Sequence, residues 1–386
     1  MKRRNIYLMY AISLLQGMVF YGPVATLYRQ AQGVSVLQIT VIESISLILC
    51  LLLEFPWGMI ADKIGYKRTL LLCCVLYFIS KIVFWKASGF GCFLLERVIL
   101  SVVIAGLSGV DSAFLYLSCK KGESQKVFGI YNSLGTAGLL FAALLFSLFV
   151  RDHYRLAGFL TVISYGLAAI LSAGLTEVRR EGERTSRTEN LWLPLQRTWK
   201  NRNLLLLLVG TALLGETHQT VTVFLNQLQY ERCGLNTAAM GYIYILVTIA
   251  GLCGAWSYKF TERLGDLRCT ALFYGSAAAA CILLAITESP LLSVLGVLML
   301  RISFSLFQPL QTELQNRQIS TDNRATALSV NAVIIDSVGA GTNIAFGQLA
   351  ETSLPVTFLF GAGLCLVGGV FVLRQIKGTK GYFFGA

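Results

Sequence analysis

Ionisable side chains lie inside long apolar segments of this sequence, and Glu216 is the most suggestive of them. It falls in the apolar run over 203–229, two residues before His218, with no basic residue at a matching depth. A charged group at the centre of a membrane costs about 2.5–3.5 kcal/mol, so such groups are rarely without function. A carboxyl that is buried without a cation suits the exchange of a proton. The alternative is a carboxyl that bonds to a neighbouring hydroxyl or faces water.

Asp111 and His218 are two further candidates for proton coupling. Asp111 lies toward the inner third of the apolar run over 92–118, where it suits a gate, a coupling role, or a local bond to Ser112 or Tyr116. The chain has only two histidines, His153 and His218, far apart in sequence. We therefore expect no metal site. We also expect no cofactor, because the proton gradient would supply the energy for transport through these acidic groups.

Four more charges are predicted inside the membrane. Glu43 and Arg97 lie about 10 and 8 Å from the outer ends of their helices, and Arg301 and Asp336 lie near the middle. These depths predict one pair in each half of the chain, Glu43 with Arg97 and Arg301 with Asp336. Each pair either fixes helix rotation as a neutralised ion pair or takes part in function.

Two other charged residues have simpler expectations. Lys81 lies about 9 Å from the outer end of its helix, so we expect it to extend toward the membrane surface, with no function. Glu313 and Arg317 are four residues apart, which predicts a supporting pair on one helix face.

The elements that must position these residues are transmembrane helices. Hydrophobic residues make up 55% of the 386 residues and charged ones 13%, too little polar surface for a water-soluble globule. Runs of about 20 apolar residues recur along the chain, each long enough to cross a bilayer. Twelve such helices are predicted, over 6–29, 36–60, 69–87, 92–118, 127–150, 156–176, 203–229, 237–259, 269–287, 291–316, 325–350 and 354–376.

The distribution of positive charge explains the net charge of +12. With the N-terminus inside, 24 of the 32 Lys and Arg fall on the inner side and 5 on the outer side. Basic residues concentrate in cytoplasmic loops of membrane proteins. We therefore expect a multi-pass protein of the cell membrane with both termini cytoplasmic, and no nucleic-acid partner.

The twelve predicted helices form two related sets of six. A polar stretch over 177–202 divides them, which predicts domains over 1–176 and 203–386 joined by a cytoplasmic linker. Gly33 precedes Asp62-Lys-Ile-Gly65 in the first half, and Gly234 precedes Glu262-Arg-Leu-Gly265 in the second. Such duplication is typical of transporters that rock two bundles about a central site. Small residues such as Gly135 and Gly138 are expected to permit close helix approach.

The loop between the second and third predicted helices carries a motif made of Gly58, Asp62, Gly65, Lys67 and Arg68. With this motif the sequence resembles the Major Facilitator Superfamily (MFS) of secondary transporters over nearly its full length. The resemblance implies an all-α membrane fold of two pseudo-symmetric six-helix bundles, in which these acidic and basic groups form an inner gate. Glu54 precedes the motif, where it could steady the basic residues or lie in water at the interface.

Three further motifs are similar to a bacterial, drug-efflux-like branch of this family. They are Glu54-Phe-Pro-Trp-Gly58, Ser108-Gly-Val-Asp-Ser-Ala-Phe-Leu-Tyr116 and Arg324-Ala-Thr-Ala-Leu-Ser329. The antiporter signature of the fifth helix is not met, because Gly135-Thr-Ala-Gly138 lacks its proline. Export by proton antiport therefore depends on the similarity to the branch.

In this family the first, fourth, seventh and tenth helices line the cavity. Aromatic walls with few polar groups suit amphipathic organic molecules, although aromatic residues in membrane helices often only pack. The candidates for substrate contact are Tyr21, Tyr28, Phe224, Asn226, Gln227, Phe307, Gln308 and Gln311.

These observations together predict a monomeric, proton-coupled exporter of small organic molecules that works by alternating access in the lipid bilayer. The alternative within transport is a dedicated permease or exporter of one metabolite, peptide or lipid. A membrane-embedded enzyme would need a nucleophile with a base or a metal cluster, and a non-transporting sensor would usually carry a soluble domain. The sequence offers neither, so we expect that the protein is not an enzyme.

Overall fold

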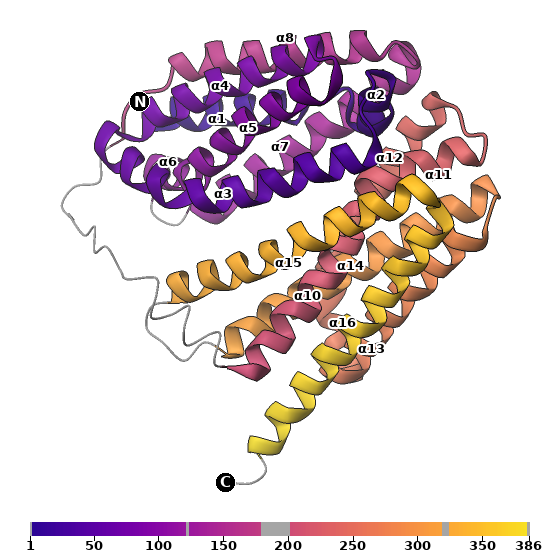
Figure 1. Cartoon of the computed structure of the whole chain (residues 1–386). Helices are drawn as coiled ribbons and strands as arrows, with labels where there is room; N and C mark the ends of the chain where they lie inside the picture. Colours follow the sequence, from indigo (N-terminus) through magenta and orange to yellow (C-terminus); the bar gives the residue numbers. More distant parts are fainter. Residues whose placement is uncertain (1, 121–122, 179–200, 319–323, 384–386) are drawn as a thin grey trace. The chain divides into compact units, whose positions relative to one another are not determined.

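The computed structural model describes residues 2–120, 123–178, 201–318 and 324–383, and within them the chain forms helices and no strands (Figure 1). The first half contains α1 to α8 with two irregular turns: α1 Lys2–Gly17, η1 Gly22–Val24, α2 Ala25–Ala31, α3 Val36–Ile64, α4 Tyr66–Lys86, α5 Gly89–Leu107, α6 Val110–Ser118, α7 Ser124–Leu145, η2 Phe146–Val150 and α8 Tyr154–Ala173.

The second half contains α10 to α16, again with irregular turns. Its elements are α10 Arg202–Gln219, η3 Thr220–Leu225, α11 Asn226–Arg232, α12 Thr237–Ala250, η4 Gly251–Trp256, α13 Ser257–Ile286, α14 Pro290–Gln318, α15 Arg324–Thr352 and α16 Leu354–Phe383.

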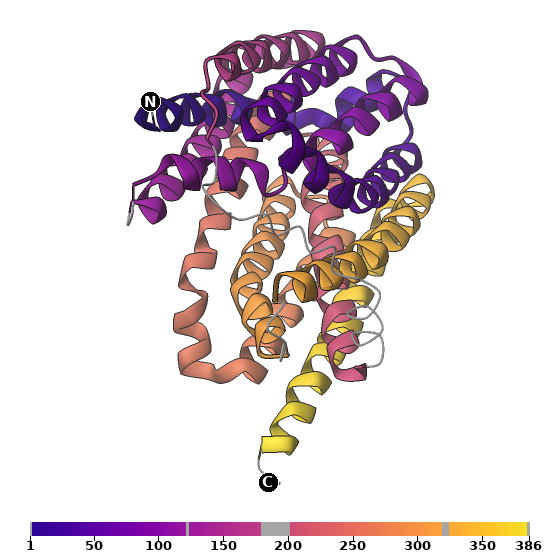
Figure 2. The ribbon, with the colours of Figure 1, turned by 90° about the vertical axis from the view of Figure 1, so that its left-hand side faces the viewer.

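Ten helical stretches of the described chain are long and apolar enough to cross a membrane. One of them, Thr237–Ile286, has 50 residues, more than twice the ~20 that one crossing needs. Gly265 breaks it with φ 75°, and Figure 2 shows this stretch, in salmon to orange, descending and turning back. Counted as two, this stretch brings the number to eleven; the 29-residue α15, which is not among the ten, corresponds to the remaining predicted helix.

Glycines with left-handed backbone mark equivalent points of the two halves. Gly33 and Gly234 have φ of 82° and 77°, and Gly65 and Gly265 have φ of 91° and 75°. Only glycine adopts this region without strain. The internal repeat predicted from these positions is therefore present in the backbone as well as in the sequence.

Two compact units make up the molecule. The N-terminal unit contains Met1–Ser35, Ile45–Ser186 and Thr237–Ile245, and the C-terminal unit contains Val36–Ser44, Arg187–Asn236 and Leu246–Ala386. The units differ from the predicted halves at two helix ends: Val36–Ser44 belongs to the C-terminal unit, and Thr237–Ile245 belongs to the N-terminal unit. The predicted boundaries at 176 and 203 stay predictions, and residues 179–200 of the linker lie outside the described part.

Close helix packing in the N-terminal unit depends on glycine. A methyl group at Gly138 would overlap the backbone oxygen of Leu14, and one at Gly17 would overlap the backbone oxygen of Gly135. Helix α7 therefore lies directly against α1, as the small residues predict.

Candidate functional site

Glu216 lies near the C-terminal end of α10, inside the C-terminal unit. Its residue is only 8% exposed. Its carboxylate oxygen Oε1 accepts a hydrogen bond of 3.0 Å from the hydroxyl of Thr220, one turn later. No ion pair to Glu216 is present among the described residues. This arrangement is the hydroxyl-bonded alternative that the sequence left open.

The Thr220 hydroxyl has a second acceptor within reach. Its oxygen lies 3.4 Å from Oδ1 of Asn343, which comes from α15. A hydroxyl carries a single proton, so it bonds fully to only one acceptor at a time. Thr220 also begins the π-helical turn η3, and such turns often occur at functional sites.

His218 lies between an aromatic ring and a guanidinium. Its ring stacks on Phe304 with centroids 4.0 Å apart, and its Nε2 lies 3.2 Å from Nη1 of Arg301. A guanidinium only donates, so Nε2 must be the unprotonated acceptor and the imidazole is neutral while this contact lasts. The hydroxyl of Thr222 also lies 3.3 Å from Nε2.

Arg301 extends from α14 toward η4. A methyl group at Gly251 would overlap the guanidinium, so the absence of a side chain there makes room for it. The predicted pairings of Arg301 with Asp336 and of Arg97 with Glu43 stay predictions.

The N-terminal unit holds a buried ion pair that the sequence analysis missed. The ammonium of Lys81 on α4 lies 3.5 Å from Oε1 of Glu96 on α5, and their side chains are 4% and 2% exposed. It also donates a 3.1 Å hydrogen bond to the hydroxyl of Tyr21. The expectation that Lys81 extends toward the membrane surface is therefore wrong for this structure: a carboxylate on the next helix stabilises it inside.

Part of the loop motif is described. Gly65 separates α3 from α4, and the backbone N–H of Lys67 lies 3.3 Å from Oε1 of Glu177. Arg68 follows on the first turn of α4. The side chains of Glu54 and Asp62, and Gly58, lie outside the described part, so the predicted gate contacts stay predictions.

Asp111 occupies the first turn of α6, directly after the break at Gly109. Its Oδ1 accepts a 2.6 Å bond from the backbone N–H of Ser112. This is one of the local bonds that the sequence allowed. On α14, Glu313 and Arg317 form the predicted pair at 2.9 Å, and Asp266 joins it at 2.7 Å from Arg317.

Most candidates for substrate contact pack inside their own unit. Tyr28 is fully buried and donates to the backbone oxygen of Trp85 at 3.0 Å, and Tyr21 stacks on Phe84 at 3.9 Å. Phe307 is fully buried against Tyr274. The side chains of Phe224, Asn226 and Gln227 are likewise buried, Gln308 is exposed and Gln311 is half-buried. Contact of any of the eight with substrate stays a prediction.

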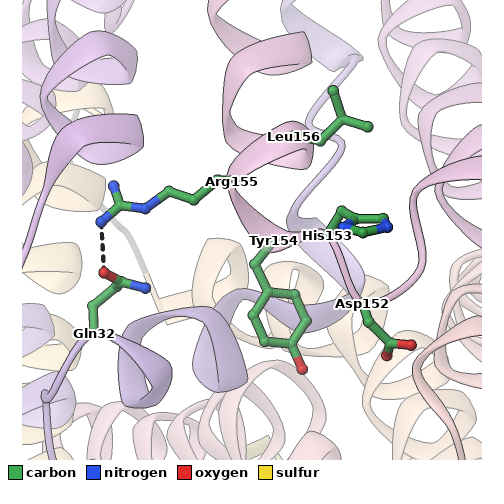
Figure 3. A pocket seen from close by; sticks show the side chains of 6 residues that line it. All are labelled: Gln32, Asp152, His153, Tyr154, Arg155 and Leu156. Atoms are coloured by element: carbon green, nitrogen blue, oxygen red, sulfur yellow. Dashed lines mark hydrogen bonds between the residues drawn. The ribbon is translucent and has the colours of Figure 1, made fainter.

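A cavity of about 560 Å³ opens beside the start of α8 in the N-terminal unit (Figure 3). Gln32 and the segment from Asp152 to Leu156 line it. Arg155 bonds to Gln32 Oε1 at 2.5 Å and also to the backbone oxygens of Trp85 and Ala87. The guanidinium thus donates to backbone carbonyls at the C-terminal end of α4, and we assign it a structural role.

Comparisons with known proteins agree with this architecture. The model of the Major Facilitator Superfamily matches residues 6–343. No curated protein sequence matches the chain.

Three solved structures are similar over almost the whole chain. The nucleoside transporter NupG has a TM-score of 0.81 at 17% identity, covering 97% of this chain and 99% of its own. A bacterial homolog of the human lysosomal transporter Spinster has 0.73 at 16% identity, and a D-xylose–proton symporter 0.73 at 13%; each covers 97% of this chain and 96% of its own.

Proposed function

Because this chain belongs to the Major Facilitator Superfamily and is a multi-pass membrane transporter rather than an enzyme, we propose that it exports small organic molecules in exchange for protons. In this proposal it acts as a monomer, needs no cofactor, and draws on the proton gradient across the cell membrane. Both termini lie in the cytoplasm, in accord with the inner excess of Lys and Arg.

The site at Glu216 is the observation that carries the proposal. A buried carboxyl without an ion pair can take up a proton without leaving a cation stranded. Thr220 then offers two arrangements. Its hydroxyl donates to the Glu216 carboxylate, at 3.0 Å, and turns toward Asn343 Oδ1, at 3.4 Å, when the carboxyl carries its own proton.

This exchange changes the hydrogen bonds between helices, which is what coupling requires. Thr220 lies at the start of η3 and Asn343 lies on α15. Protonation of Glu216 would thus strengthen the contact of η3 with α15 and weaken the contact of η3 with α10. Alternating access would follow if the substrate favours one arrangement and the proton the other.

Asp111 and His218 are the second choices for the proton-carrying group. A proton on His218 Nε2 would exclude the Arg301 contact, and Asp111 already bonds to the adjacent backbone. In the proposed cycle, Asp62, Lys67 and Arg68 hold the inner gate shut while the site is open to the outside.

The test uses purified protein in liposomes with an imposed pH gradient and a panel of dyes, antibiotics and metabolites. Wild-type protein should move at least one amphipathic compound against its gradient and move protons in return. Glu216→Gln should lose this coupled movement and still bind the compound. Glu313→Gln, an exposed acid of α14, is the matched control and should behave as wild type.

Full coupled transport by Glu216→Gln would refute the assignment of the proton site. A profile limited to one metabolite, peptide or lipid would instead favour a dedicated permease or exporter.

A further inference from the structure

Lys81 is enclosed by three tyrosine rings as well as by Glu96. Its ammonium nitrogen lies 5.8 Å from the ring centre of Tyr21, 5.1 Å from that of Tyr77 and 5.4 Å from that of Tyr165. An ammonium within about 6 Å of an aromatic face is attracted by the ring quadrupole. We refer to Tyr21, Tyr77, Tyr165 and Glu96 as the ammonium cage.

The cage is assembled from distant parts of the N-terminal unit. Tyr77 and Lys81 share one face of α4, Glu96 comes from α5 and Tyr165 from α8. Tyr21 immediately precedes η1. Tyr21, Glu96 and Tyr165 are 7%, 1% and 2% exposed. Packing around one cation from four segments gives the cage a fixed shape.

Lys81 does not use all the hydrogen-bonding capacity of the Glu96 carboxylate in this cage. The ammonium lies 3.5 Å from Glu96 Oε1, long for a charge-assisted hydrogen bond of about 2.7–2.9 Å. The second carboxylate oxygen, Oε2, is buried and accepts no hydrogen bond within the described chain. A buried carboxylate with an unused acceptor leaves a place for another donor.

Displacement of the Lys81 ammonium requires a second position within reach of its side chain. Lys81 is five residues before Lys86, where α4 ends, which is about 7.5 Å along the helix axis. Its flexible four-carbon stem can therefore carry the ammonium toward the membrane surface. If it moves there, the cage keeps its negative charge and its three rings, ready for another cation.

We propose that the ammonium cage is a binding site for organic ammonium compounds, with Lys81 as a tethered occupant that the ligand displaces. Proteins commonly bind such cations with aromatic rings, and a carboxylate adds the opposite charge. The exchange replaces one cation by another, so the buried charge stays balanced. This inference rests on the proposed export of organic molecules and names their class.

The first test measures binding in nanodiscs with n-butylammonium, which copies the end of the lysine side chain. Lys81→Met removes the ammonium that competes for the cage and leaves a flexible apolar side chain of similar length, so its affinity should exceed that of wild type at least tenfold. Lys81→Met/Glu96→Gln should lose this binding, and 1-butanol should bind to none of the three proteins. Equal affinity in the single and double variants would overturn the proposal.

Lys81→Met leaves Glu96 without a cation, so it is purified in n-butylammonium chloride, with sodium chloride as the comparison. The amine should raise the folded yield of Lys81→Met alone. If Lys81→Met folds in neither salt while the double variant folds in both, the cage does not accept the ligand and the proposal fails.

The second test separates a binding site from a mere structural pair. Neutral butylamine crosses lipid unaided, so counterflow in liposomes uses butyltrimethylammonium, a permanent cation that the rings and the charge of Glu96 attract without a hydrogen bond. Wild-type protein should show saturable counterflow, with a half-saturating concentration that Lys81→Met lowers at least tenfold. No counterflow in wild type would overturn the proposal. Neither assay needs a pH gradient, so this outcome is independent of Glu216.

Discussion

The two units stabilise buried charge in different ways. In the N-terminal unit the Lys81 ammonium meets a carboxylate and three rings. In the C-terminal unit Glu216 accepts from a neutral hydroxyl, and Arg301 donates to a neutral imidazole. An ion pair resists a change in either charge, because the partner would be left buried alone. A carboxyl bonded to a neutral group can change its charge at lower cost. The first arrangement suits exchange of a whole cation, the second exchange of a proton.

The largest expected effect is loss of the N-terminal carboxylate. Glu96→Gln removes the counter-charge that holds the Lys81 ammonium in the cage, so stability should fall by up to about 3–5 kcal/mol, the value for a charge that stays buried unpaired. Denaturant unfolding in detergent measures this. Lys81→Met/Glu96→Gln should recover most of the loss, because both charges are gone. A double variant as unstable as Glu96→Gln would contradict an ion pair.

A smaller loss of stability is expected from changes at the contact between Arg301 and His218. His218→Ala removes an acceptor of Arg301 and the ring stacked on Phe304, so stability should fall by about 2–3 kcal/mol. His218→Gln keeps an acceptor and should lose less. The same unfolding measurement ranks the two variants, and the reverse order would argue that the Arg301 contact contributes little.

Thr220→Val should cost about 1 kcal/mol, the usual value of one neutral hydrogen bond. The isosteric side chain removes only the hydroxyl that Glu216 and Asn343 share. Transport should be affected more than stability, because both arrangements of the proton site lose their donor. Coupling ratios in liposomes check this, and an unchanged ratio would remove Thr220 from the site.

The smallest effect on stability is expected for Glu216→Gln, within about 1 kcal/mol of wild type. Glutamine can still accept from Thr220, and no buried cation loses its partner. Glu216→Gln and Glu96→Gln make the same chemical change, one in each unit, so their stabilities can be compared directly. If both variants lose equal stability, the contrast between the units is wrong.

The missed ion pair shows where prediction from sequence stopped. Lys81 and Glu96 lie on α4 and α5, on either side of a short turn at Ala87 and Ser88. Their distances from that turn are similar, six and eight residues, and this could have suggested a contact across the helical hairpin. Helix rotation decides whether two such side chains face each other, and the periodicity of an almost uniformly apolar helix does not fix rotation.

The sequence by itself determined the class of fold and its repeat. Long apolar runs must be helical in lipid, since every backbone polar group needs a partner there, and the glycines at 65 and 265 had to be turns. The sequence also placed Glu216 in a helix without a matching cation. Tertiary structure alone decided the partners: the Thr220 hydroxyl lies between Glu216 and Asn343, and tyrosines from α4, α8 and the turn before η1 surround Lys81. Such contacts depend on angles and rotations between helices, which arise from packing of the whole unit and not from any one segment.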